Sequence, residues 1–207
     1  IINNSLNSAL HFIISDDNIF NNLTIENTSL SYYDVKFQSS NADGNKFVNT
    51  PLANYSIGGA GNKLIFKETG LGEIEFLEVI NGTGTNLSSD IQIADNFAYV
   101  NSSSNSGLNK SANVTLYGTP AGSLNNPDIL RDGEICSSSI CYNFTSLTAE
   151  TVVFNVTGWS NYTIGDKTFP TLSISSPSNN SYSSDTGLDI LYTATDSNLD
   201  SCWYSSN

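Results

Sequence analysis

Charged side chains are scarce in this chain, and basic ones are the scarcest. Of 207 residues, 13% are charged, with 7 Lys and Arg against 20 Asp and Glu and a net charge of −13. A globular domain ordinarily has about 25% charged residues. Nucleic acids and anionic membranes bind clusters of Lys and Arg, and the sequence has no such cluster. The composition therefore argues against both partners and leaves a surface built from Asn, Ser, Thr and Gly.

Long apolar runs are missing as well. No stretch approaches the roughly 20 apolar residues that a membrane helix needs, so we expect membrane contact only through regions outside this chain. The chain opens on Ile1 rather than Met, and it ends at Asn207 within a strand-like segment. We therefore expect a fragment of a longer exported polypeptide.

Cysteine is limited to three residues. Cys136 and Cys141 flank a Ser-Ser-Ser-Ile loop. In an oxidising compartment they are expected to form a disulfide, which contributes about 2 kcal/mol on the loop-entropy model. A metal site is the alternative, but two thiols and the single, distant His11 do not make a four-ligand set. Cys202 is left as a free thiol or as the partner of a cysteine beyond Asn207.

Asn-x-Ser/Thr triplets, the acceptors of N-linked glycan, are abundant instead. With 28 Asn and 50 Ser or Thr, chance alone would produce about 7 triplets, and the sequence has 13. They begin at Asn3, Asn22, Asn27, Asn54, Asn81, Asn86, Asn101, Asn109, Asn113, Asn143, Asn155, Asn161 and Asn179. The excess predicts an extracellular, glycosylated cell-surface protein, with chance composition accounting for about half of the triplets.

Strand-like alternation dominates, and no segment shows sustained helical periodicity. In residues 112–116 the apolar Ala, Val and Leu share one face, and Asn113 lies on the other. Asn155 likewise opposes the apolar Phe154 and Val156. A glycan on such an outward face would leave the core undisturbed. We take Asn113, Asn155, Asn143, Asn81 and Asn22 as the candidate glycosylation sites.

A weak repeat runs through the first third of the chain. Residues 18–25 align with residues 45–52, 27 positions later, and the alignment of residues 9–15 with 34–39 places Phe12 against Phe37. Residues 62–67 add Phe66 in the same role as these two. A period of 25–29 residues with short strands indicates stacked coils. Aligned Asn side chains are then expected to form amide ladders at the corners.

The Asn-x-x-Asn-Asn-x-x-Ile pattern of residues 18–25, with its partner at Asn45, resembles the last coils of a right-handed parallel β-helix of the pectin-lyase-like and NosD-like superfamily. The resemblance covers about residues 1–79 and implies a fold that carries enzymes, adhesins and stalks alike. Lyases of this kind need a basic residue, and the only Arg, Arg131, lies outside the segment. Lys36, Lys46, Lys63 and Lys67 are expected at solvated strand positions.

Acidic catalysis has equally little support. Asp16 and Asp17 resemble a glycosidase Asp pair, but they lack companion motifs, and turn residues are the better interpretation. Glu73, Glu75 and Glu78 would meet a second acid only if coils stacked them. His11 lies in an apolar run without a triad motif, and the glycine-rich residues 57–62 lack the helix and Lys-Ser/Thr pair of a phosphate loop.

Residues 80–167 predict a small β-sandwich, because short strands alternate with Gly, Ser and Asn turns. The expected strands are 90–94, 96–101, 112–117, 128–131, 151–157 and 159–164. Residues 154–164 resemble the closing strands of small sandwich modules that follow β-helices in archaeal surface proteins. Trp159 and Tyr162 are expected in the core, the alternative being a sugar-stacking platform.

The last segment begins with a Pro- and Ser-rich linker, residues 168–180. Residues 188–196 and 199–204 resemble the second and third strands of an Ig-like module of prokaryotic surface proteins. Since a domain cut at its third strand cannot bury a core, we expect residues 168–207 to be exposed. No cofactor is expected. Calcium is a weaker alternative, with Asp185, Asp189, Asp196 and Asp200 as oxygen ligands.

The sequence thus predicts an all-β chain in three parts: terminal coils of a parallel β-helix (1–79), a small β-sandwich (80–167) and a truncated Ig-like module (168–207). The expected role is a non-catalytic, structural or adhesive one, with carbohydrate or another cell-surface protein as partner. The alternative is the C-terminal part of a β-helix polysaccharide lyase or glycoside hydrolase whose active site lies upstream.

Overall fold

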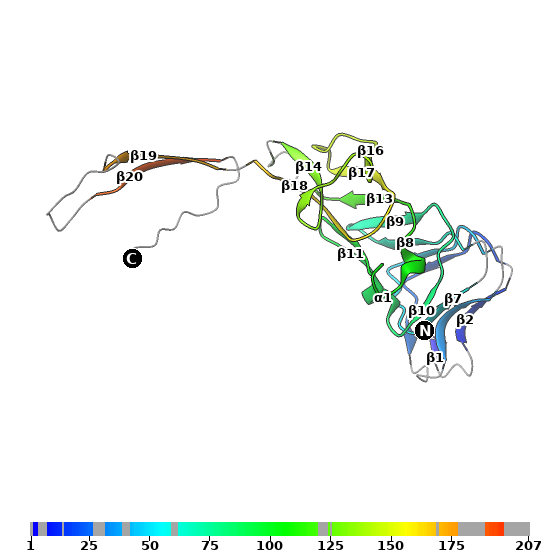
Figure 1. Cartoon of the computed structure of the whole chain (residues 1–207). Coiled ribbons are helices and arrows are strands. Elements are labelled where there is room, and N and C mark those ends of the chain that lie inside the picture. Colours follow the sequence, from blue (N-terminus) through cyan, green and yellow to red (C-terminus); the bar gives the residue numbers. More distant parts are fainter. Residues whose placement is uncertain are drawn as a thin grey trace.

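The regular structure of the chain is predominantly β-strand, arranged in several sheets, with almost no helix. The computed structural model describes residues 2–3, 8–13, 15–26, 32–38, 42–58, 62–119, 124, 126–168, 170–177 and 189–196. Strands β1 to β18 form one body, and strands β19 and β20 form a hairpin beyond it (Figure 1). Among the described residues, no helix has the length and apolar character required to cross a membrane.

Strands in the first third of the chain pair in parallel. One set comprises β2 (Ser8–Phe12), β5 (Tyr33–Phe37) and β7 (Tyr55–Ile57), which β10 (Gly82–Gly84) extends in the antiparallel direction. A second set comprises β3 (Ile19–Asn21), β6 (Lys46–Val48) and β8 (Ile65–Glu68). A short parallel pair joins β1 (Ile2–Asn3) to β4 (Ile25–Glu26). Sequence-distant segments therefore lie side by side in the same direction.

The first two segments of the sequence repeat pair in the structure as their alignment predicts. The third segment, residues 62–67, does not. Phe12 pairs with Phe37, and Phe20 with Phe47, as the alignment predicts. Phe66, however, pairs with Phe47 and so belongs to the second set rather than to the column of Phe12 and Phe37. The reason is a shorter connection: Lys46 pairs with Ile65 only 19 residues later, whereas Ile19 pairs with Lys46 27 residues later.

Asparagine side chains bridge successive parallel strands, as the repeat predicts. Asn18 Nδ2 donates to Asn45 Oδ1 at 2.8 Å, and Asn45 in turn donates to the carbonyls of Ser15 and Ala42. At the opposite strand end, Asn49 Nδ2 donates to Asn22 Oδ1 at 3.1 Å. Asn45 is fully buried, so its hydrogen bonds satisfy a polar side chain that water does not reach, whereas the hydrogen bond between Asn49 and Asn22 is exposed.

A seven-stranded sheet joins the parallel strands to the rest of the body. After β8 the chain turns back into β9 (Gly72–Phe76), and antiparallel pairing then continues through β13 (Ala112–Tyr117), β17 (Thr151–Val156) and the edge strand β16 (Cys141–Asn143). The strand order is β16-β17-β13-β9-β8-β6-β3. This sheet is continuous across residues 79 and 80, where the sequence predicts a boundary.

A five-stranded antiparallel sheet faces it. Its order is β11-β12-β18-β14-β15, and its strands are β11 (Ile91–Ala94), β12 (Phe97–Val100), β18 (Asn161–Asp166), β14 (Pro127–Arg131) and β15 (Glu134–Ile135). The two helical turns are α1 (Leu87–Asp90) and the 3-10 turn η1 (Ser106–Leu108). The six strands expected between residues 90 and 164 are all present, with ends shifted by up to two residues. The sequence does not predict strands β15 and β16.

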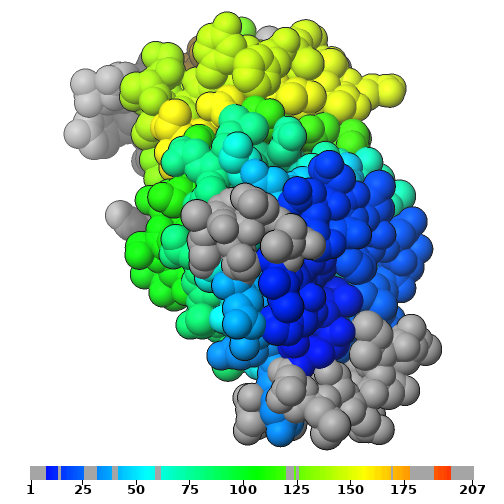
Figure 2. Space-filling view, turned by 90° about the vertical axis from the view of Figure 1, so that its right-hand side faces the viewer, coloured from blue at the N-terminus to red at the C-terminus, as the bar shows by residue number. Residues whose placement is uncertain are grey.

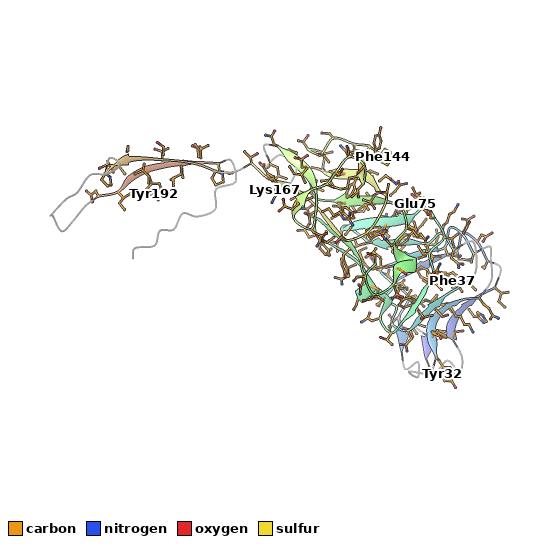
Figure 3. All side chains as sticks on the ribbon, in the orientation of Figure 1. Tyr32, Phe37, Glu75, Phe144, Lys167 and Tyr192 are labelled. Atoms are coloured by element: carbon orange, nitrogen blue, oxygen red, sulfur yellow. A yellow bond between two sulfur atoms is a disulfide. The ribbon has the colours of Figure 1, made fainter. Side chains whose placement is uncertain are left out.

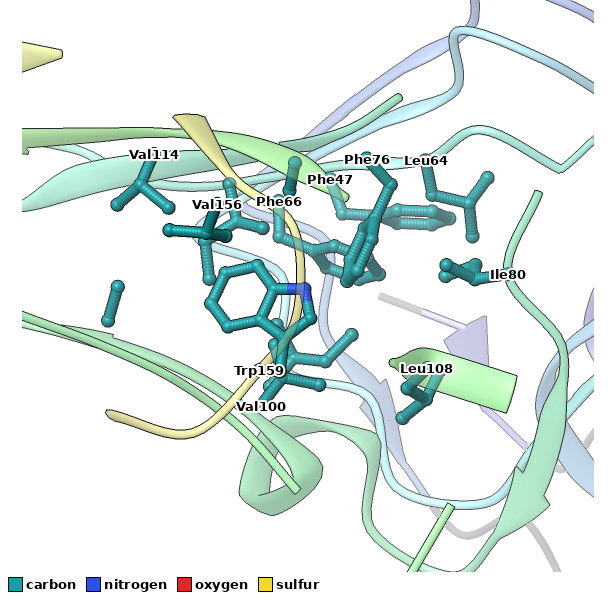
Figure 4. Packing of buried hydrophobic residues seen from close by; sticks show 14 of the residues in the cluster. Phe47, Leu64, Phe66, Phe76, Ile80, Val100, Leu108, Val114, Val156 and Trp159 are labelled. Carbon is teal, nitrogen blue, oxygen red and sulfur yellow. The ribbon is translucent and has the colours of Figure 1, made fainter. Parts of the chain in front are cut away.

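One hydrophobic core fills the body from Phe12 to Ile164. Trp159 lies inside it, 2% exposed, with its ring centroid 5.8 Å from that of Phe76 (Figure 4). The Tyr162 ring centroid lies 5.7 Å from that of Trp159. Its indole Nε1 donates to the carbonyl of Lys110 at 2.7 Å. Tyr162 is fully buried and donates its hydroxyl to the carbonyl of Gly158. The structure therefore confirms Trp159 and Tyr162 as core residues and excludes them as a surface sugar platform.

The hairpin of β19 (Thr171–Ser176) and β20 (Leu191–Thr195) extends away from this core (Figure 1). Its large apolar side chains are solvent-exposed, Leu172 by 65% and Tyr192 by 52%. The exposure expected for residues 168–207 is thus confirmed for the described part of that segment. Trp203 and Cys202 lie outside the described residues, as do Asp185 and Asp200 of the calcium hypothesis.

Candidate functional site

The outer face of the seven-stranded sheet carries a continuous row of aligned side chains. Register pairs link them across six neighbouring strands, and we call this set the outer row: Lys46, Ile65, Glu75, Asn113, Asn155 and Tyr142. Alternate residues of the same strands are buried in the core, among them Ile74, Val114 and Phe154. Because successive strand residues point to opposite faces, the outer row faces away from the core.

Two of the predicted glycosylation sites meet in this row. Asn155 Nδ2 donates to the carbonyl of Ala112 at 3.1 Å and to Asn113 Oδ1 at 3.4 Å. Asn113 Nδ2 donates to Glu75 Oε2 at 3.0 Å. Both Asn side chains are half-buried. The nitrogen that would hold a glycan is therefore already a hydrogen-bond donor within the sheet at both positions.

Beside the outer row, the next register row contains a small group of charges. Glu73 Oε2 accepts from Lys46 Nζ at 2.7 Å and lies 3.6 Å from Lys67 Nζ. Lys67 Nζ also donates to the Tyr117 hydroxyl at 3.3 Å and lies 5.4 Å from the centre of that ring. The hydrogen bond to Tyr117 is the main cause that raises the pKa of Lys67. These two lysines are therefore paired groups of the face, not the solvated side chains that the sequence predicts.

Two exposed aromatic rings complete the face at its β16 edge. Tyr142 is 65% exposed and Phe144 54% exposed, and their rings meet edge to face with centroids 5.2 Å apart. Cys141, at the start of β16, is buried and forms a disulfide with Cys136, with an S–S distance of 2.00 Å. Figure 3 labels Phe144 and Glu75 along the same margin of the body. Exposed aromatic pairs beside polar groups are typical of binding surfaces.

One side of the molecule thus gathers segments that are distant in sequence. In Figure 2 the colours run from blue through turquoise to yellow over a single surface. The sequence could have indicated Tyr142 and Phe144 as a pair, because residues two apart on a strand share a face. Which face they occupy follows from the burial of Cys141, and no sequence pattern specifies that.

The remaining candidate glycosylation sites lie at exposed turns and strand ends. Asn143, Asn81 and Asn22 are exposed. Asn143 Oδ1 accepts from the backbone N–H of Thr145 at 3.3 Å, so the triplet Asn143-Phe144-Thr145 forms a turn. Asn54 departs from the expected surface placement, because it is only 7% exposed. Its carbonyl accepts from the N–H of Asp34 within the parallel strands.

The residues considered as catalytic candidates do not come together in one site. His11 is exposed and bonds Gln38 Oε1 at 2.8 Å. Asp16 Oδ1 accepts from the N–H of Asp43, and Asp17 has a positive φ of 55°, so both belong to a turn as predicted. Glu75 and Glu78 accept bonds from Asn113 and Ser111, respectively, rather than facing a second acid. The described residues contain no group of three or more His, Cys, Asp or Glu arranged to hold a metal ion.

Comparisons of the chain with protein-family models, curated proteins and solved structures gave no match.

Proposed function

We propose that this chain is a non-catalytic segment of an exported cell-surface protein and that it contacts carbohydrate through the outer face of its seven-stranded sheet. The exposed pair Tyr142 and Phe144, standing beside the amide and carboxylate groups of the outer row, is the observation that carries the proposal. Sugar rings present an apolar C–H face that packs on aromatic rings and hydroxyls that exchange hydrogen bonds with amides and carboxylates.

The shape of the face favours an extended polymer over a small molecule. Neighbouring strands are about 4.8 Å apart, so the outer row, which crosses six strands, is long enough for several sugar units. Its polar groups are already held in place by the bonds between Asn155, Asn113 and Glu75. A prepared surface loses little side-chain entropy when a ligand binds.

We further propose that residues 1–79 are the final coils of a parallel β-helix, followed by a sandwich and the start of an Ig-like module. The support is the parallel pairing at intervals near those of the sequence repeat and the bond between Asn18 and Asn45. Export is supported by the disulfide between Cys136 and Cys141 and by the excess of glycosylation triplets, since disulfides persist in oxidising compartments.

Binding of the intact chain to a panel of immobilised polysaccharides, which includes pectins and alginates, tests the proposal. The double variant Tyr142→Ala/Phe144→Ala is expected to weaken binding by roughly tenfold or more, the usual loss at a central aromatic contact. Its melting temperature should stay close to that of the wild type, because both rings are exposed. Tyr192→Ala, which removes an equally exposed ring from β20, is the matched control.

Three outcomes would contradict the proposal. The first is failure of the wild type to bind any polysaccharide of the panel, and the second is binding by the double variant that equals binding by Tyr192→Ala. Release of cleaved product from any pectin or alginate would overturn the non-catalytic part.

A further inference from the structure

A cleft of about 360 Å³ lies on the opposite side of the same strands. It opens between the ends of β6 and β8 on one side and α1 with β11 on the other. Of these elements, β8, β11 and α1 lie close together in Figure 1. On β8, Phe66, Lys67 and Glu68 all border the cleft, but the Lys67 ammonium reaches the outer face, where it contacts Tyr117 and Glu73. No residue of the outer row lines the cleft. The cleft is therefore distinct from the outer row.

The floor of the cleft is apolar. Phe47 and Phe66 stack with ring centroids 5.6 Å apart, and the buried side chains of Leu52, Leu87 and Ile91 complete the lining around them. Burying an apolar group against such a floor contributes about 25 cal/mol per Å² of surface removed from water. The floor alone would accept any aliphatic group.

Most polar groups at the rim already have partners within the protein. Ser88 Oγ accepts from the N–H of Leu52 at 2.8 Å and lies 3.2 Å from its carbonyl. Thr50 Oγ1 donates to the carbonyl of Val48 at 2.9 Å. Gln92 Nε2 donates to the carbonyl of Ser89 at 2.7 Å. A ligand rich in hydroxyl groups would find few free partners here.

Glu68 is the charged exception at this rim. No described residue forms a hydrogen bond or an ion pair with its carboxyl group, and partial burial raises its pKa. The neighbouring Lys67 does not neutralise it, because that ammonium group is engaged with Glu73 and Tyr117. A partly desolvated carboxylate above an apolar floor favours a cation, since an opposite charge compensates for the lost hydration.

We propose that this cleft binds a primary ammonium group at the end of an aliphatic stem, with the stem on the Phe47–Phe66 floor and the ammonium on Glu68. A lysine side chain of a partner protein and a free alkylamine share this chemistry. The net charge of −13 raises the local concentration of either one near the surface. The inference is independent of carbohydrate binding at the outer row.

The test measures binding of Nα-acetyl-lysine amide to the full chain by calorimetry, with Nα-acetyl-norleucine amide as the probe that keeps the aliphatic stem and lacks the ammonium. The lysine probe should bind at least tenfold more tightly than the norleucine probe. Glu68→Gln should remove that difference. Glu150→Gln, an equal charge change at an exposed position, should preserve it.

Further measurements distinguish a free amine from a lysine side chain and identify the results that contradict the proposal. Cadaverine in place of the lysine probe distinguishes a free amine from a peptide side chain, and tight binding of either supports the proposal. Equal binding of the two amide probes, or undiminished binding by Glu68→Gln, would overturn it. So would binding of glucose in the absence of lysine-probe binding. Since Glu68 has no partner to lose, Glu68→Gln should melt no lower than the wild type, and a clear loss of stability would also contradict the assignment.

The two proposals can fail separately. Tyr142→Ala/Phe144→Ala should leave lysine-probe binding unchanged, because both rings lie on the outer side of the sheet. Conversely, Glu68→Gln should leave polysaccharide binding unchanged.

Discussion

The hydroxyl of Tyr55 connects the parallel strands to the following sandwich, and removing it tests whether the two parts unfold together. Tyr55 on β7 is fully buried. Its hydroxyl donates to Asp90 Oδ2 at 2.7 Å and accepts from Asn105 Nδ2 at 2.6 Å. Asp90 also accepts from Asn101 Nδ2 at 3.0 Å. Tyr55→Phe deletes one oxygen and keeps the ring that fills the core.

The expected loss of stability follows from what remains after the deletion. The Asp90 carboxylate loses one donor and the Asn105 amide loses its nearest acceptor. A hydrogen bond to a charged group contributes about 1.5–3 kcal/mol, so we expect a loss of about 2 kcal/mol. For a chain of this size, that lowers the melting temperature by about 4–8 °C and the urea midpoint by about 1 M.

The assay is urea unfolding followed by Trp159 fluorescence in a Trp203→Phe background, with far-UV circular dichroism as the second probe. Trp159 lies in the sandwich, on the far side of residue 79 from Tyr55. Because one core runs through both parts, both probes should report the same lowered midpoint. Tyr99→Phe, at a half-buried position where no described residue forms a hydrogen bond with the hydroxyl, should shift neither probe.

A Trp159 midpoint that stays at the wild-type value while the circular dichroism midpoint falls would contradict a single cooperative unit. That result would mean that residues before and after position 79 unfold independently.

Three further predictions concern single groups. Gly84→Ala should destabilise the protein by about 1–3 kcal/mol, because its Cβ would lie 2.5 Å from the Tyr55 ring; chemical denaturation measures this loss, and an unchanged midpoint would contradict it. Burial raises the pKa of Tyr162 from 10.0 to about 12, so the unfolded chain releases that proton first. The protonated Tyr162 hydroxyl therefore makes its full contribution to the free energy of unfolding below pH 10, and this contribution falls by about 1–2 kcal/mol as the pH rises towards 12. Tyr162→Phe should reduce that decline in urea titrations. Replacing Cys136 and Cys141 together by Ser should lower stability by about 2 kcal/mol on the loop-entropy model, and thermal melts that coincide with the wild type would exclude this contribution.

The fold was predictable where the chain repeats itself. The spacing of Asn18 and Asn45 predicts the correct strand register, and the hydrogen bond between their side-chain amides follows from the same alignment. Phe66 was misplaced because both sets of parallel strands carry inward Phe residues, and a repeat of Phe does not say which set it belongs to. The shorter connection, which brings Ile65 beside Lys46, assigns Phe66 to the set of β3, β6 and β8.

The candidate site was less accessible to sequence reasoning. The expectation that Trp159 and Tyr162 lie in the core is correct, because large aromatic rings in a small β-sandwich more often fill its core than its surface. Tyr142 and Phe144 point outward for a tertiary reason, namely that Cys141 turns inward. The cleft beside Glu68 depends on elements from both sides of residue 79 meeting in space, and no local pattern describes that meeting.

The reversal of direction at β9 has a consequence for assembly. A stack of parallel strands exposes at its last strand an edge that another copy could extend, and natural proteins block such edges. Here β9 folds back along β8 and occupies that edge. The sheet ends instead at β16, which is three residues long and follows a disulfide-closed loop. The parallel pairing of this sheet therefore ends at β8, and no other copy can add a strand at that edge.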